Sequence, residues 1–547
     1  MEFIGVDIVY LLELTWDSHI YRFSSRPIIL DNDSENESLS FQGTLSEIEY
    51  IESSNLFGLV IEEQAIPMEL VFDSINLVKE RMRGRVLDNS RGELSYIILS
   101  RETDSTKDDY QDRIILFRGR VSQPIIGDRS QPIGHVAFSL VQGVEVDDFL
   151  IEETTRQIPS ENPATIGKYY PFVFGKCGSK NYSRDESGDI TIDNYFVAPA
   201  YLRENSPWVP SANLVIAGHP VLATSVRCID GVGVESTRAI TEVFDDKNRF
   251  VFSQVDLYSD GGAGFTLSTG DNARYYVAWT GGGLPNPYGE GVLEGGLDII
   301  RYILEQGDID VDWKSFEGYA PLLNSYKFAG YLNRPTKALE FLQSQIIPYM
   351  PCEISFGKLG MRLVVPLMYN TLYSNPTRSI LENASFYFIG SLVSELELNE
   401  IVNHVVMNYG YSAKTENYIG LQIEVNPNGT MNDSFKSTSI YSDLSFNRYG
   451  LRTRSLEVPF VYAVEVAMRI AHDLVRQKSL GVLRIQAIAD ISYNDIEVGD
   501  VIDITSDIYF LNEHPCQVIK KQIINNSVQF ELIFEENPIR HPRQTGD

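Results

Sequence analysis

The chain has 547 residues, of which 43% are hydrophobic and 22% charged, so it belongs to the ordinary globular class and has length for several domains. Its 75 acidic and 45 basic residues give a formal net charge of −30. This charge argues against a broad nucleic-acid-binding surface, which needs clustered Lys and Arg. It favours solubility, or an acidic surface that repels a passing polyanion.

The cysteines and the first residues indicate a reducing compartment. The four cysteines lack zinc-site spacing and are expected to be buried free thiols: Cys177, Cys228, Cys352 and Cys516. Residues 1–19 lack the basic start of a signal peptide, and acidic residues interrupt their apolar stretch. No apolar run long enough to span a bilayer occurs elsewhere, so we expect no integral membrane segment and folding in a cytoplasm.

Residues 1–150 are expected to form a first small β-barrel domain. The apolar runs 93–102 and 112–126 flank a polar loop, as in a long hairpin, and 135–146 supplies the next strand. Gly119 interrupts the second run, where we expect a bulge or a close approach of backbone.

Residues 151–290 are predicted to form a β-rich insertion domain with long loops. A Pro- and Gly-broken segment that starts near Val146 leads into it. Within 257–296, glycines punctuate aromatic strands, and a docking site and a gate remain alternatives for this stretch.

Residues 291–385 are predicted to form an α/β module. Helix 295–307 has an apolar face, and a second helix spans 333–351 between two prolines. A β-hairpin follows, with its turn at 357–360.

Residues 386–547 are expected to form a second β-barrel domain with a long helix at 457–479. The helix carries one apolar stripe, made of Ala463, Val466, Ala467, Ile470, Ala471 and Leu474. We expect it to lie on the final strands, whose last turn is Asn525–Asn526. The fold class is therefore mainly β with α+β insertions: two small β-barrels plus intervening β-rich and α/β modules.

No motif with catalytic or metal-binding chemistry stands out. The acidic segments 31–37 and 307–313 lack the glycine and the closing Glu of a calcium loop, and 245–248 has turn composition. The glycine-rich 261–271 lacks the helix and the Lys-Ser/Thr of a phosphate loop. No histidine has ligand spacing, and packing is the favoured role of His472. We predict no catalytic, cofactor-binding or metal residues and no enzyme activity.

Three segments, in order, resemble the tail hub (baseplate hub or tail tip) proteins of tailed bacteriophages and related gene transfer agents. The strand–Gly–strand stretch 114–125 is similar to the first barrel of such hubs, and 162–177, with its G-x-x-x-P-x-V-x-G pattern, to the segment that follows it. The helix, strand and Gly-Asp turn of 467–505, ending in "IEVGDVIDIT", resemble the second barrel. We attribute no chemistry to Gly499 and Asp500 themselves.

The resemblance implies a virion structural protein at the tail tip, assembled in the cytoplasm of a host bacterium. Three copies with two similar barrels each would form a ring that joins the sixfold tail tube to threefold fibres or a spike and gates DNA exit. The implied partners are the chain itself as a homotrimer, the distal tail, tail tube and tape measure proteins, and tail fibre or spike proteins. DNA would be met only transiently in the lumen.

Two alternatives stay open at this point. The 30 tyrosines suit a receptor- or carbohydrate-binding tail tip protein as well as they suit β packing. A tail-associated glycoside hydrolase needs two carboxylates that converge in a cleft, which a sequence does not exclude.

Overall fold

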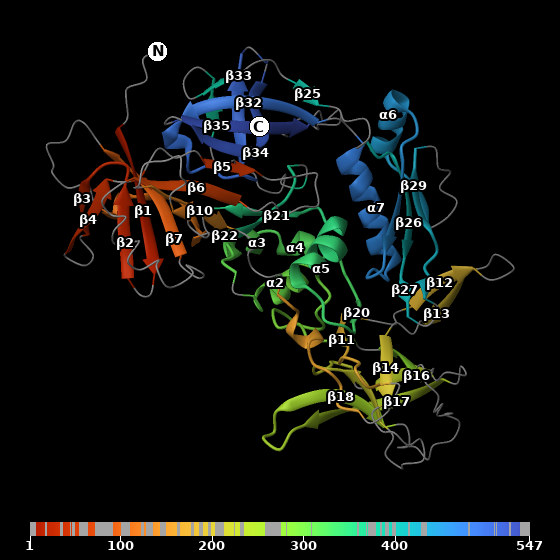
Figure 1. Cartoon of the computed structure of the whole chain (residues 1–547). Helices are drawn as coiled ribbons and strands as arrows, with labels where there is room; N and C mark the ends of the chain where they lie inside the picture. The colour runs from red at the N-terminus through yellow and green to blue at the C-terminus, as the bar shows by residue number, and fades with distance from the viewer. Residues whose placement is uncertain are drawn as a thin grey trace.

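A computed structural model of the chain (Figure 1) defines the fold. It describes residues 7–16, 19–32, 37–43, 45, 50–53, 64–71, 91–99, 110–121, 125–126, 135–142, 149–160, 165–176, 180–184, 190–194, 198–202, 213–223, 225–229, 235–256, 275–279, 282–307, 309–357, 360–367, 369, 379–382, 386–388, 393–395, 401–413, 416–427, 435–479, 482–507, 509, 511–524 and 527–535.

The first part of the chain forms a nine-stranded sheet in the order β3-β4-β2-β1-β7-β8-β10-β6, with β9 paired to β10. Its strands are β1 (Asp7–Trp16), β2 (His19–Ser24), β3 (Ile28–Asn32), β4 (Glu37–Gly43), β6 (Gln64–Val71), β7 (Arg91–Leu99), β8 (Ile114–Val121), β9 (Ile125–Ile126) and β10 (His135–Gln142). The predicted hairpin is confirmed, because β7 and β8 pair antiparallel. The register shift of this pair lies opposite Leu94 and Ser95, whereas Gly119 pairs directly with Gly92.

The last part of the chain forms an eight-stranded sheet in the order β23-β33-β34-β35-β32-β24, to which β25 and β5 add. Its strands are β5 (Tyr50–Ser53), β23 (Ser379–Leu381), β24 (Phe386–Phe388), β25 (Val393–Glu395), β32 (Val482–Asp490), β33 (Val501–Ser506), β34 (Leu511–Ile524) and β35 (Ser527–Glu535). Ile524 pairs with Ser527, which confirms the predicted hairpin across residues 525–526.

The two sheets are joined by one strand, which comes from the first part of the chain and adds to the final sheet, and by a common core. β5 comes from the first part of the chain and pairs antiparallel with β34, so that Tyr50 is opposite Ile523. One hydrophobic cluster contains Leu12, Phe117 and Leu140 of the first sheet together with Ile485 and Phe530 of the last. Figure 1 shows the first sheet beside the final sheet. The two ends of the chain therefore form one block, which we call the sheet block.

A closed barrel lies between them in sequence, in the order β14-β15-β18-β17-β16-β19. Its strands are β14 (Ala198–Leu202), β15 (Asn213–Ala217), β16 (Ser225–Ile229), β17 (Glu235–Phe244), β18 (Phe250–Asp256) and β19 (Tyr275–Trp279). The mainly β class with α/β insertions is confirmed. The closed barrel formed by the described strands lies in the predicted loop-rich insertion, and it occupies the opposite end of the molecule from the sheet block (Figure 1).

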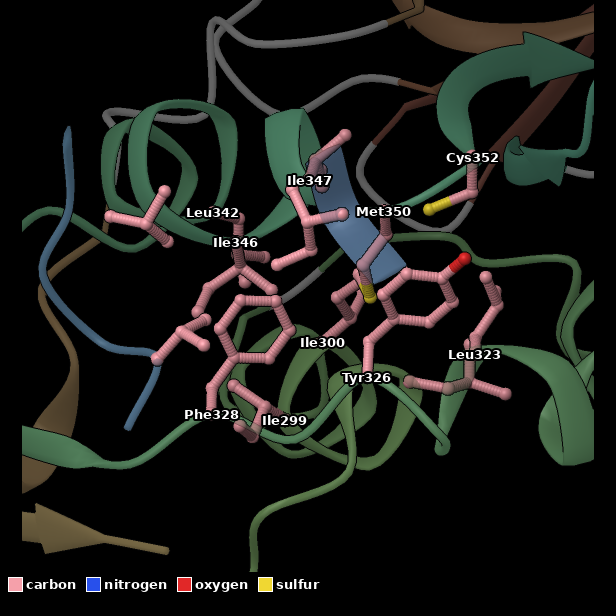
Figure 2. Packing of buried hydrophobic residues seen from close by; sticks show 14 of the residues in the cluster. Ile299, Ile300, Leu323, Tyr326, Phe328, Leu342, Ile346, Ile347, Met350 and Cys352 are labelled. Atoms are coloured by element: carbon pink, nitrogen blue, oxygen red, sulfur yellow. The ribbon is translucent and has the colours of Figure 1, made fainter. Parts of the chain in front are cut away.

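The α/β module contains the predicted helix and hairpin. It has α2 (Gly296–Leu304), α3 (Trp313–Glu317), α4 (Ala320–Leu323), β20 (Gly330–Leu332) paired with β11 (Phe172–Phe174), and the hairpin β21 (Glu353–Gly357) and β22 (Gly360–Val364). The second predicted helix is shorter and irregular: α5 (Ala338–Phe341) continues as a π-helical turn, Leu342–Ile346, and a 3-10 turn, Ile347–Tyr349. Figure 2 shows Ile299 and Ile300 of α2 packed with Ile346, Ile347 and Met350 in the core of this module.

A four-stranded sheet in the order β30-β29-β26-β31 carries the long helix. The elements are β26 (His404–Tyr409), β29 (Ile423–Asn426), β30 (Lys436–Thr438), α6 (Ile440–Tyr449), β31 (Thr453–Val458) and α7 (Val464–Lys478); the hairpins β12 (Lys180–Arg184) with β13 (Ile190–Asn194) and β27 (Tyr411–Ser412) with β28 (Asn417–Tyr418) complete the described strands.

The prediction for α7 was wrong at its start and in its position. Residues 453–458 form strand β31, and the helix begins only at Val464. Its apolar stripe packs on β26 and β29 instead of the final strands. Among the described helices, none has the length and apolarity that crossing a membrane would need.

Candidate functional site

A polar contact lies inside the core of the sheet block. Lys521 of β34 is fully buried, and its Nζ donates a 2.8 Å hydrogen bond to the backbone oxygen of Asn494, which is also fully buried. Tyr96 of β7 lies near the Asn494 side chain, and burial raises the pKa of Tyr96 to about 12. Because lysine is rarely buried without polar partners, this contact fixes the position of β34 against the segment that follows β32 in the final sheet.

A second polar cluster joins the hairpin β21–β22 to the sheet block. One guanidinium nitrogen of Arg362 lies 2.7 Å from Glu497 Oε2, and the other lies 3.0 Å from Asp500 Oδ1. The second oxygen of Asp500 accepts a 2.9 Å hydrogen bond from the backbone N–H of Glu497. Gly499, between the two acids, has φ +93°, and a Cβ there would lie 2.7 Å from Val364 Cγ2.

Gln517 of β34 extends this cluster. Its side-chain nitrogen donates to the backbone oxygens of Val365 and Gly499 at 2.9 and 3.0 Å, and its oxygen accepts from the backbone N–H of Leu367 at 3.0 Å. The amide is fully buried and its polar atoms have partners. We call Arg362, Glu497, Asp500 and Gln517 the hairpin clasp, because together they hold β22 against the final sheet.

Asp473 of α7 binds two tyrosines of the α/β module. Tyr369 donates a 2.7 Å hydrogen bond to one carboxylate oxygen, and Tyr326 donates to the other. Burial, and then the Asp473 charge, raise the pKa of both hydroxyls. On the neighbouring residue, His472 Nε2 lies 2.6 Å from Ser437 Oγ of β30. The polar side of α7 thus ties its sheet to the α/β module.

His219 connects the closed barrel to β11. Its Nε2 accepts a 2.8 Å hydrogen bond from the backbone N–H of Val173, so Nδ1 carries the proton and donates to the Pro220 oxygen at 2.7 Å. The ring packs edge-on against Phe172. Burial lowers the pKa of His219 to about 4, and the imidazole is neutral near pH 7.

One face of the nine-stranded sheet carries a row of charges across four neighbouring strands. Glu13 of β1 and Glu93 of β7 are direct cross-strand neighbours. Arg22 of β2 lies 2.7 Å from Glu13, and Arg118 of β8 lies 2.8 Å from Glu93. Arg113 also reaches Glu93, at 3.1 Å. Each of these two adjacent carboxylates is thus paired with an arginine. The pairing offsets the repulsion between two like charges in direct cross-strand register.

The acidic and turn segments that the sequence singles out lie between or at the ends of regular elements. Segment 31–37 joins β3 to β4, and its residues 33–36 lie outside the described residues. In 307–313, Val311 forms an isolated β-bridge with Met361, and α3 begins at Trp313. Asp245 accepts from the backbone N–H groups of Lys247 and Arg249, which confirms the turn. In the described part of the chain, His, Cys, Asp and Glu do not gather in groups of three suited to a metal.

The other predicted positions are described only in part. Residues 257–274, including the glycine-rich 261–271, lie outside the described ranges, as does Cys177. Gly282 and Gly283 are buried against Val292 and the Val173 backbone, so this end of 257–296 packs internally. Free and buried thiols are confirmed for the three remaining cysteines: Cys228, Cys352 and Cys516.

Comparisons with known proteins give structural likenesses. No family model and no curated protein matches the sequence. The structure is similar to the 43 kDa tail protein of prophage MuSo2 from Shewanella oneidensis, with 7% identity, a TM-score of 0.37 and coverage of 96% of this chain and 98% of that chain. A tail protein from Neisseria meningitidis gives 7% identity, a TM-score of 0.37 and coverage of 96% and 95%. A chain of the virion of a native gene transfer agent gives 12% identity, a TM-score of 0.39 and coverage of 71% and 89%. TM-scores this low do not establish a shared fold.

Proposed function

We propose that the chain is a structural tail hub of a bacteriophage-type tail: a homotrimeric ring at the tail tip that joins the tail tube to fibres or a spike. The observation that carries this proposal is the sheet block. β5 pairs with β34, and Leu12 and Phe530 share one core, so the two terminal sheets form one packed unit.

A block with two large sheets suits a protein that connects assemblies of different symmetry. Three copies present six sheets, so a ring of three copies can match a sixfold ring above it and a threefold assembly below it. Two of the three segments that resemble tail hubs reach this block: 114–125 contains β8, and 467–505 contains the Gly499–Asp500 turn of the hairpin clasp. The third, 162–177, contains β11, which pairs with β20.

The partners follow from this position. The tail tube, the distal tail protein and the tape measure protein would meet the ring on one side, and fibres or a spike on the other. DNA would pass the lumen during ejection, with the ring gating its exit, and the protein would reside in the virion after assembly in the host cytoplasm. The role is structural, with no catalytic step.

Mass photometry of the purified chain tests the ring directly. The expected result is a trimer, either alone or on co-expression with its tube or distal tail partner, and a ring in electron micrographs. A monomer that forms no ring with either partner contradicts the proposal. Specific binding on a glycan array by that monomer would instead favour the carbohydrate-binding alternative.

A further inference from the structure

Several tyrosine hydroxyls of this chain are paired with carboxylates, and an arginine commonly covers the same ring. The clearest case is at α2. Tyr288 donates a 2.5 Å hydrogen bond to Glu305 Oε2, and Arg301 Nε lies 2.8 Å from the other carboxylate oxygen. The guanidinium carbon of Arg301 also lies 4.4 Å from the centre of the Tyr288 ring. One arginine thus makes an ion pair and a cation–π contact at once.

The same arrangement recurs at three more tyrosines of the described residues. In each, the hydroxyl donates to a carboxylate and an arginine lies over the ring: Tyr110 with Glu13 and Arg113, Tyr326 with Asp473 and Arg469, and Tyr369 with Asp473 and Arg476. Tyr302, which donates to Glu153, differs. Its ring stacks on Phe172, and Gln306 donates to the second carboxylate oxygen at 2.9 Å. In this chain, a tyrosine beside a carboxylate is commonly completed by an arginine.

Tyr418 of β28 also lies beside a carboxylate. Burial, and then the charge of Glu457, raise the pKa of Tyr418 to about 12. Glu457 is exposed on β31. Tyr411 of β27 is the cross-strand partner of Tyr418, and the two rings meet edge to face with 5.7 Å between their centres. The backbone N–H of Tyr411 donates to the oxygen of Pro459, two residues after Glu457. Two tyrosine rings and one carboxylate therefore lie together where β27, β28 and β31 meet.

This group lacks the arginine that completes the others. Among the described residues, no lysine or arginine forms an ion pair with Glu457, and none lies over the ring of Tyr411 or Tyr418. Arg454 is on the same strand as Glu457, but three residues away, so its side chain is on the opposite face of the sheet. Burial raises the pKa of Tyr349, and the charge of Arg454 opposes that rise. Glu457 thus carries a negative charge at an exposed position without a cation beside it.

We infer that Tyr411, Tyr418 and Glu457, which we call the tyrosine–carboxylate site, bind an arginine side chain of a basic partner protein. Charge complementarity carries the choice of occupant, because the Glu457 charge is uncompensated and the chain as a whole has a formal net charge of −30. Arginine can stack on a tyrosine ring while it pairs a carboxylate, as Arg301 does at Tyr288 and Glu305. The inference rests on the proposed function only in placing this partner among the tail proteins.

Fluorescence anisotropy of a fluorescein-labelled tetra-arginine peptide, titrated with the full chain, tests the site. At about 150 mM NaCl, distant charges are largely screened, so contacts at the site dominate. Glu457→Gln should weaken binding about fivefold, the upper range for an exposed ion pair. Tyr418→Leu should weaken it to a similar extent, because a ring face is lost. Tyr418→Trp should keep or tighten binding, because tryptophan offers the strongest cation–π surface.

Three controls accompany these variants. Glu317→Gln removes the same charge from an exposed position of α3 and should leave binding unchanged. A tetra-lysine peptide should bind the unmodified chain more weakly, because an ammonium group does not form two parallel hydrogen bonds with a carboxylate. Thermal melting followed by circular dichroism checks that each variant is folded, and binding by Tyr418→Trp shows that the hairpin β27–β28 tolerates substitution.

Each contrary outcome has its own meaning. If Glu317→Gln weakens binding as much as Glu457→Gln, the peptide responds to the acidic surface in general and the site is overturned. If Glu457→Gln abolishes binding of choline but leaves binding of the arginine peptide unchanged, the site belongs to a quaternary ammonium ligand instead. A trimer that dissociates on Glu457→Gln would assign the arginine to a second copy and overturn the basic partner. A monomeric chain that binds the arginine peptide through Glu457 contradicts the proposed ring and leaves this site in place.

Discussion

The side-chain nitrogen of Lys521 and the backbone oxygen of Asn494 are joined by a 2.8 Å hydrogen bond inside the core shared by the first and last sheets. The ammonium group of a lysine at this depth has lost its hydration and is stabilised by a small number of protein partners. Its removal should therefore act first on the final sheet, because the bond ties β34 to the segment that follows β32.

Replacing Lys521 by Ala is expected to destabilise the sheet block by about 3 kcal/mol, from the cavity and the lost hydrogen bond. Lys521→Met should cost about 1 kcal/mol, because it fills the volume without a polar group. Differential scanning calorimetry measures both. The neighbouring Lys520, which is half-buried, is the control: if Lys520→Ala is as destabilising as Lys521→Ala, the buried contact has no special role.

Substitutions at Gly499 and Gly450 distinguish the energetic cost of backbone strain from the cost of steric crowding. Both have positive φ, +93° and +71°, but a Cβ at Gly450 has no atom within 4 Å, whereas at Gly499 it would meet Val364. Gly450→Ala should cost about 1–2 kcal/mol from strain alone, and Gly499→Ala about 1–3 kcal/mol more from overpacking.

Adding Val364→Ala to Gly499→Ala makes space for the new methyl group. The double variant should recover part of the crowding cost, as read from the shift in unfolding temperature. Equal effects of Gly450→Ala and Gly499→Ala would mean that the close approach to Val364 does not exist in solution.

Arg362→Leu should loosen the hairpin from the sheet block by roughly 3 kcal/mol, because it leaves Glu497 and Asp500 without their shared cation. Hydrogen exchange of β21 and β22 should rise. Adding Glu497→Gln and Asp500→Asn removes the uncompensated charges and should restore most of the protection. If that triple variant exchanges as fast as Arg362→Leu, the clasp does not act through charge.

His219 makes stability depend on pH in a defined window. Its pKa falls from 6.5 to about 4 on burial, so between these values the unfolded chain binds a proton that the folded chain does not. The stabilisation is complete above pH 6.5 and is lost as pH falls toward 4. Over the whole window this amounts to about 3 kcal/mol. His219→Gln keeps a donor and an acceptor and does not titrate, so its unfolding temperature should vary less over this range.

Local elements were predictable from residue pattern, because they depend on neighbours in sequence. Helix α2 and the hairpins β21–β22 and β34–β35 were found from apolar spacing and turn residues. The start of α7 was missed, since residues 453–463 have apolar content compatible with strand and helix, and pairing of β31 with β26 decides between them.

The candidate sites depend on distant pairs and were therefore not predictable. In the sequence, Asp500 is typical of an ordinary turn residue. Its contact with Arg362 becomes visible only when the fold places β22 beside the turn. A signal did exist for Lys521: it alternates with Ile523 on the core side of β34, and a charged residue in phase with a buried one marks an internal polar contact.

The pairing of β5 with β34 also determines when the final sheet can form during synthesis of the chain. A ribosome makes residues 50–53 long before residues 511–524, so the early strand waits for almost the whole chain before its partner exists. Until then Leu12, Phe117 and their neighbours lack half of their core. A chain that stops before β34 exposes apolar surface and unpaired strand edges, which proteases and chaperones recognise. Finished copies alone would then be available for assembly.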